Sequence, residues 1–217
     1  MMILNKPLRS LQIMAVFILT QASPSVRVLA EVDVFKQSAE LGSRTAKTSD
    51  DVREYVGQLD KTEKALFLLT QAQGKDLRKR YESFSKEVSK LKQAQDLATS
   101  DINAMTSKGA AYFSSWSASI AQISDEQLRQ ASTERRTMLM KEHDELAARL
   151  HDIGTQLQPF MSDLQDINTF LRADLSPANA SNANGMIQKS QTDARLLKER
   201  IAVVQAMLKQ FLSQAPK

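Results

Sequence analysis

Apolar residues recur along this chain at alternating spacings of four and three, the pattern of helices that each bury one face. The longest such run predicts a helix over about residues 75–122. At about 1.5 Å per residue that helix is roughly 70 Å long, so we expect an elongated molecule. The apolar seam of this run comprises Leu77, Tyr81, Phe84, Val88, Leu91, Gln95, Ala98, Ile102, Met105, Gly109, Tyr112 and Trp116.

Two further runs continue the same rhythm. Ser124 and Asp125, with Gln127, predict the N-terminal cap of a third helix. Pro159 lies inside that helix, and because the rhythm runs through it we expect a kink and not a break. Residues 176–185, rich in Asn, Ser, Pro and Gly, predict a loop before the last helix. The two seams are Leu146, Leu150, Ile153, Leu157, Phe160, Leu164, Ile167 and Leu171, then Ile187, Ala194, Leu197, Ile201, Val204, Leu208 and Phe211.

The pattern over residues 32–73 is helical but uneven. We expect a break at Gly42, a new helix cap within residues 48–51, and a helix end at Gly74. The apolar face of that helix is Val52, Val56, Leu59, Leu66 and Leu69. Residues 23–47 are therefore expected to be a flexible or irregular helical lead-in, and residues 48–217 a helical bundle domain.

Together these elements predict an all-α fold, an elongated antiparallel bundle of about four long helices with coiled-coil-like heptad seams. Composition agrees, because only 6 glycines and 5 prolines occur in 217 residues.

The N-terminus predicts a secretory signal peptide over residues 1–22. Lys6 and Arg9 precede an apolar run over residues 11–19, and small residues follow at Ala22. Cleavage after Ala22 suits the distance from this run better than cleavage after Ala30, and both sites stay open. The run is about half of the roughly 20 residues that span a bilayer, so an uncleaved membrane anchor is the weaker alternative. We expect a periplasmic or otherwise extracytoplasmic, soluble mature protein without an integral membrane domain.

Charge and cysteine content narrow the chemistry further. The formal charge of +4 falls to +2 without Lys6 and Arg9, which argues against nucleic acid as a partner. The chain has no cysteine, which excludes disulfides, thiolate metal sites and a cysteine nucleophile. Two histidines occur: the seam rhythm places His143 toward the core beside Leu139, and His151 toward solvent. Glu142 or Glu145 could join one of them as a second ligand, but two ligands do not make a metal site, and we expect no enzyme, no cofactor and no metal.

Aromatic residues gather at Tyr112, Phe113 and Trp116, near the end of the predicted second helix. Two interpretations stand: the three rings close one end of the bundle, or they are exposed partner contacts.

Five segments appear in a characteristic order: Gly74 with Leu77 and Tyr81, then residues 112–116, 128–132, 157–161 and 170–175. This order resembles the bacterial family called domain of unknown function 2959, exported helical proteins found mainly in Gram-negative bacteria. The resemblance covers about residues 50–213. It implies the helical fold and an envelope location and carries no site, because the family has no established activity. The chain departs from the family pattern at residues 172–176, where members usually have Lys-His-Asn-Leu-Asn, and members are commonly more acidic.

The leading functional hypothesis is a non-enzymatic envelope protein acting as a scaffold or protein-interaction module, with a protein partner or a homo-oligomer. The alternative is an extracytoplasmic chaperone-like protein that binds unfolded clients on an amphipathic helical surface, suggested by the nine methionines.

Overall fold

The structure is a computed structural model that describes residues 24–72 and 75–214, with side chains from residue 34 onward. The predicted signal peptide of residues 1–22 and the predicted helix end at Gly74 lie outside the described residues.

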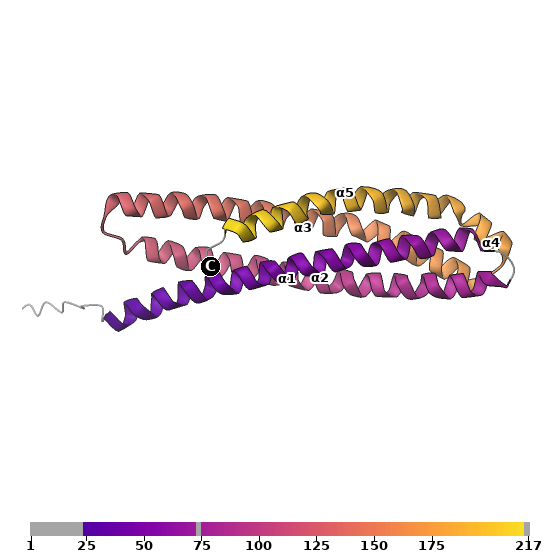
Figure 1. Cartoon of the computed structure of the whole chain (residues 1–217), viewed down its shortest axis with the longest axis horizontal. Helices are drawn as coiled ribbons and strands as arrows, with labels where there is room; N and C mark the ends of the chain where they lie inside the picture. Colours follow the sequence, from indigo (N-terminus) through magenta and orange to yellow (C-terminus); the bar gives the residue numbers. More distant parts are fainter. Residues whose placement is uncertain (1–23, 73–74, 215–217) are drawn as a thin grey trace, which may run out of the picture.

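Four long helices build the molecule, and a short fifth helix joins the last two (Figure 1). They are α1 (Pro24–Thr70), α2 (Asp76–Ile120), α3 (Glu126–Ala173), α4 (Pro177–Asn182) and α5 (Asn184–Gln214). Successive long helices run in opposite directions, and the described residues contain no strand. The prediction of an elongated, antiparallel, all-α bundle is therefore confirmed.

The long helices form a closed ring in cross-section. α1 packs along α2, α2 along α3, α3 along α5, and α5 returns to α1. The three seams predicted for α2, α3 and α5 line the core, where every predicted position is buried or partly buried. This burial of one stripe on each rod is what stabilises helices of this length.

Helix α3 begins where the sequence indicates. Asp125 is its N-cap, and the Asp125 carboxylate accepts a hydrogen bond from the backbone N–H of Leu128 at 2.9 Å. α3 continues through Pro159 without a break, and Pro159 itself is exposed.

The predicted break at Gly42 and the predicted cap within residues 48–51 are both wrong. One helix, α1, runs through both positions, so the expected irregular lead-in is helical from Pro24 onward. The reason is tertiary: Thr48 is fully buried, and its hydroxyl donates to the backbone carbonyl of Asp101 on α2 at 3.2 Å instead of capping its own helix. Gly42 adopts no left-handed conformation.

The predicted loop at residues 176–185 is wrong over most of its length. Ser176 caps α4 by accepting a hydrogen bond from the backbone N–H of Asn179 at 3.3 Å, and Pro177 follows at the first helical position. Both residues favour helix starts as much as turns, so a turn-rich composition here encodes one short helix followed directly by α5.

Candidate functional site

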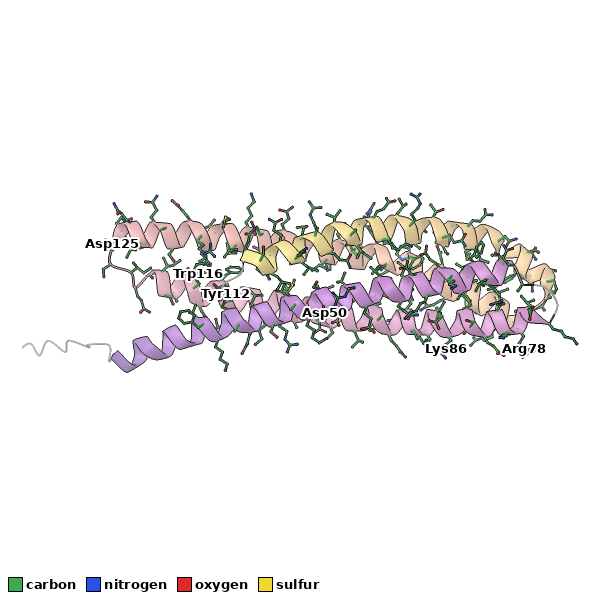
Figure 2. All side chains as sticks on the ribbon, viewed as in Figure 1. Asp50, Arg78, Lys86, Tyr112, Trp116 and Asp125 are labelled. Carbon is green, nitrogen blue, oxygen red and sulfur yellow. The ribbon has the colours of Figure 1, made fainter. Side chains whose placement is uncertain are left out.

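The three aromatic residues singled out in the sequence lie together near the α2–α3 turn, whose far side is marked by Asp125 in Figure 2. Ring centroids are 5.1 Å apart between Tyr112 and Phe113, and 5.5 Å apart between Tyr112 and Trp116. Phe113 and Trp116 are nearly parallel at 6.5 Å. The sequence therefore identified a genuine cluster.

Most of this cluster belongs to the core. Tyr112 and Phe113 are buried, while Trp116 is partly exposed and its indole N–H donates to Ser132 Oγ at 3.1 Å. Burial raises the pKa of Tyr112, against a smaller lowering by its hydrogen bond with Ser38. A partner contact thus stays a prediction for Trp116, whereas Tyr112 and Phe113 are buried in the core of the chain.

His143 extends the cluster from α3 toward α5. Its ring is buried, with centroids 5.6 Å from Phe113 and 5.8 Å from Phe211. The expected core position is confirmed, and His151 is exposed as expected. His143 Nδ1 lies 3.2 Å from an Asp144 carboxylate oxygen, so its polar neighbour is Asp144 and not Glu142 or Glu145.

The opposite ring nitrogen of His143 packs against the backbone of α2. Nε2 is buried and has no hydrogen-bond partner among the described residues. A Cβ placed on Gly109 would lie only 2.1 Å from that nitrogen and 2.3 Å from Cε1. Gly109 is therefore needed to let α2 approach the imidazole, a requirement that its place in the apolar rhythm does not reveal.

Within residues 24–72 and 75–214, no three His, Asp or Glu side chains are arranged to hold a metal ion. Apart from the Asp144 carboxylate at Nδ1, the His143 ring contacts the Phe113 and Phe211 rings and lies against the backbone at Gly109, which are packing surfaces.

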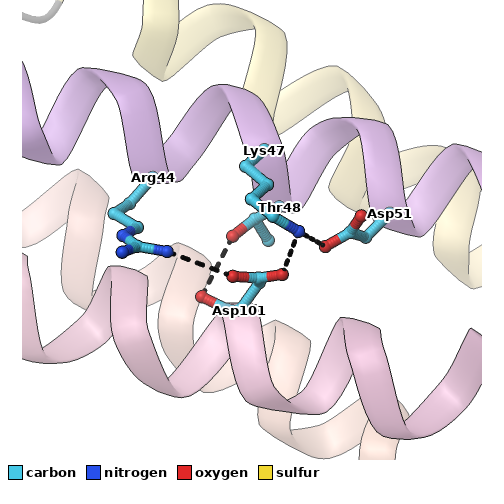
Figure 3. Close-up of polar contacts among 5 residues, drawn as sticks. All are labelled: Arg44, Lys47, Thr48, Asp51 and Asp101. Atoms are coloured by element: carbon cyan, nitrogen blue, oxygen red, sulfur yellow. Dashed lines mark hydrogen bonds and ion pairs between the residues drawn. The ribbon is translucent and has the colours of Figure 1, made fainter.

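A second polar cluster joins α1 and α2 near the middle of the bundle (Figure 3). Asp101 of α2 is 7% exposed, and its carboxylate pairs with Lys47 and, at 3.5 Å, with Arg44. Lys47 also pairs with Asp51 at 3.0 Å. Thr48 completes the cluster through its hydrogen bond to the Asp101 backbone.

The two carboxyl groups of this cluster titrate differently. The pKa of Asp101 lies below its usual range because of hydrogen bonding with Asp51 and then with Lys47. Burial raises the pKa of Asp51, and its hydrogen bond with Asp101 adds to that effect. Hydrogen bonds to Asp101 and Asp51 raise the pKa of Lys47. The cluster is thus an ion-paired clamp between two helices.

Sequence reasoning missed this clamp. Lys47 and Asp51 stand four residues apart, a spacing typical of a solvated helix pair. Asp101 directly precedes the seam residue Ile102, so a position next to the core could be predicted for it. Its partners Lys47 and Arg44, however, lie 54 and 57 residues away, in the lead-in that was predicted to be irregular.

A small cavity of about 40 Å³ lies at mid-bundle between residues of all four long helices, including Tyr55, Gln95, Leu150 and Ile201. The Tyr55 hydroxyl is buried without a hydrogen-bond partner in the described part of the chain, and burial raises the pKa of Tyr55. The volume is enough for about three or four water molecules, at roughly 10–15 Å³ each.

Among the helices described, none combines the length and the apolar character needed to cross a membrane. The model of the family described as "Protein of unknown function (DUF2959)" matches residues 40–214. No curated protein and no solved structure matches the chain.

Proposed function

For this chain, which belongs to the family of unknown function DUF2959, we propose a non-enzymatic role outside the cytoplasm as a scaffold or protein-interaction module. The export half of this proposal rests on the leader sequence, where Lys6 and Arg9 precede an apolar run of signal-peptide length. The interaction half rests on the shape and surface of the bundle.

The observation that carries the interaction role is the outer surface of the long helices. Nine large hydrophobic side chains are exposed there, although the seams already supply each helix with a complete buried stripe. Isolated exposed hydrophobics are ordinary, but six of these nine lie on α3 and α5, helices of 48 and 31 residues that pack against each other. Such rods suit lengthwise association with another helical protein.

Affinity capture from crosslinked cell envelopes tests the role. The full chain, carrying a C-terminal tag, is expected to enrich the same few envelope proteins in repeated captures, and light scattering after size exclusion reports any homo-oligomer. A strictly monomeric protein that enriches no envelope protein over an unrelated exported bundle contradicts the proposal.

A chaperone-like role is the second candidate, and it is favoured by the exposure of Met138 on α3 and Met186 on α5 and by Met207, which lines a depression between these helices. Flexible thioether side chains adapt to varied clients. Suppression of the aggregation of a model client at a near-equal molar ratio supports this role. Unchanged client aggregation at a several-fold excess of the protein excludes it.

A further inference from the structure

The outward edge shared by α3 and α5 can be defined by register. Lys189 pairs with Asp163, and Arg200 donates a hydrogen bond to Gln156, across this edge. Each of these four residues immediately precedes a buried residue of its own helix. We give the name α3–α5 face to the residues in this register, those directly before a buried residue and not buried themselves, between positions 138 and 170 on α3 and between 186 and 210 on α5.

This face collects most of the exposed large hydrophobic side chains. Five of the nine in the described residues belong to it. The other four are scattered over the other sides and the α3 end. The five are Met138, Phe170, Met186, Leu196 and Val203.

The face is also hollowed. Two depressions of about 300 and 230 Å³ adjoin each other, and both are lined by Arg149 and Val203. Buried seam residues form their floor, Phe211 in the first and Ile153 with Val204 in the second. The face is therefore a groove with an apolar floor and polar rims, the form that receives an amphipathic helix.

The charge on the face is opposite in sign to that of the chain. Three basic residues occur there against six carboxylates, although the whole chain carries +4. The six acidic positions are Glu142, Glu145, Asp152, Asp163, Asp166 and Asp193.

The basic residues leave part of this acidity free. Arg149 pairs with Glu145 at 3.1 Å, and Lys189 with Asp193 at 3.0 Å as well as with Asp163. Glu142, Asp152 and Asp166 have no ion pair among the described residues, although Asp152 accepts a hydrogen bond from the Gln156 amide at 2.8 Å and Glu142 lies beside the Gln214 amide. The negative charge of these three carboxylates is therefore not neutralised by a cation of the described part of the chain.

From these observations we infer that the α3–α5 face is a docking groove for a basic amphipathic helix of another protein. The inference rests on the proposed interaction role and names its partner class. Apolar side chains of the partner would cover Leu196 and Val203, and lysines or arginines flanking them would meet the unpaired carboxylates. A second copy of this chain would instead bring six carboxylates against six, and an anionic membrane surface would be repelled.

A synthetic helical peptide tests the inference directly. The peptide has about 28 residues, with leucine at both core positions of each heptad and lysine at the flanking positions. A second peptide carries glutamate in place of every lysine. Fluorescence anisotropy with the full chain measures their dissociation constants at low and high salt.

The paired variants are matched for charge and exposure. The face variant is Leu196→Lys with Val203→Lys, at side chains 42% and 53% exposed. The control variant is Phe67→Lys with Leu97→Lys, at 53% and 57% exposed on the other sides of the bundle. Circular dichroism and urea midpoints verify that both variants fold like the unmodified chain.

The inference expects saturable binding of the lysine peptide, weakened at least about ten-fold by the face variant and by less than about two-fold by the control. It also expects binding to weaken at high salt and the glutamate peptide to stay unbound. Equal binding of both peptides to the unmodified chain overturns it, and this comparison needs no variant. Equal losses of affinity for the lysine peptide in the face variant and the control variant overturn it too. So does a homodimer of the unmodified chain that is absent in the face variant.

Failure here is distinguishable from failure of the proposed function. Envelope partners whose capture is unaffected by the face variant leave the interaction role intact and refute the groove. Specific peptide binding without any captured envelope partner supports the groove and contradicts the proposed interaction role in the envelope.

Discussion

Replacing Gly109 by alanine adds a single methyl group at the contact between α2 and the His143 ring. That methyl carbon would lie 2.1 Å from Nε2, 2.3 Å from Cε1 and 2.8 Å from Cδ2 of the imidazole. The ring has little freedom to retreat, because Phe113 and Phe211 flank it on either side. Either the ring adopts a strained rotamer or α2 and α3 move apart.

Two opposing contributions set the size of the effect. Overpacking a core position costs about 1–3 kcal/mol. Alanine is better than glycine inside a helix by roughly 0.8–1 kcal/mol, which offsets part of that cost. We therefore expect Gly109→Ala to lower the free energy of unfolding by up to about 2 kcal/mol.

Gly57→Ala is the matched control, because Gly57 lies inside α1 and its added Cβ would meet no atom within 4 Å. This variant is expected to raise stability by roughly 0.5–1 kcal/mol. Urea denaturation followed by circular dichroism at the helical minima measures both changes.

A double-mutant cycle with His143→Ala identifies the cause. Once the imidazole is gone, Gly109→Ala should stabilise the protein as Gly57→Ala does, giving a coupling energy between the two sites equal to the overpacking cost, about 1–3 kcal/mol. A Gly109→Ala protein as stable as Gly57→Ala refutes the close-contact argument. So does a loss of equal size in the His143→Ala background.

Three further predictions concern the rest of the bundle. Asp101→Asn should cost about 0.5–1 kcal/mol at pH 7, because Lys47 and Arg44 are half exposed. Since the folded-state pKa of Asp101 is depressed, the difference between wild type and variant should be complete above the unfolded pKa of about 3.9 and vanish as pH falls through the folded value; a difference that grows toward acid contradicts this. Pro159→Ala should stabilise the protein by about 1–3 kcal/mol in urea denaturation, because an exposed helix interior regains a backbone donor; a loss of stability contradicts this. Leu150→Ala, which enlarges the central cavity, should cost about 2–5 kcal/mol, whereas exposed Leu97→Ala should change stability by less than about 0.5 kcal/mol, and equal effects would place Leu150 outside the core.

Whether a candidate site could be predicted from the sequence depends on whether its residues lie on one helix or on two. The aromatic residues near the end of α2 and the core position of His143 could be predicted, because both follow from counting along one helix. The Asp101 clamp and the fit of Gly109 to His143 could not be predicted, because each depends on the register between two helices. The same limit applies to the α3–α5 face, whose two rows of side chains are separate in the sequence and adjacent only in the bundle.

By itself the sequence determined that long helices form, which stripe of each one is buried, and that the bundle is elongated. These properties depend on side chains three and four residues apart, so local order encodes them. The tertiary structure decided where helices continue or stop: packing on α2 carries α1 through Gly42 and residues 48–51, and Ser176 starts a helix where composition predicted a loop. A residue that caps one helix can equally bond to a neighbouring helix, and the choice depends on which partner the fold brings within reach.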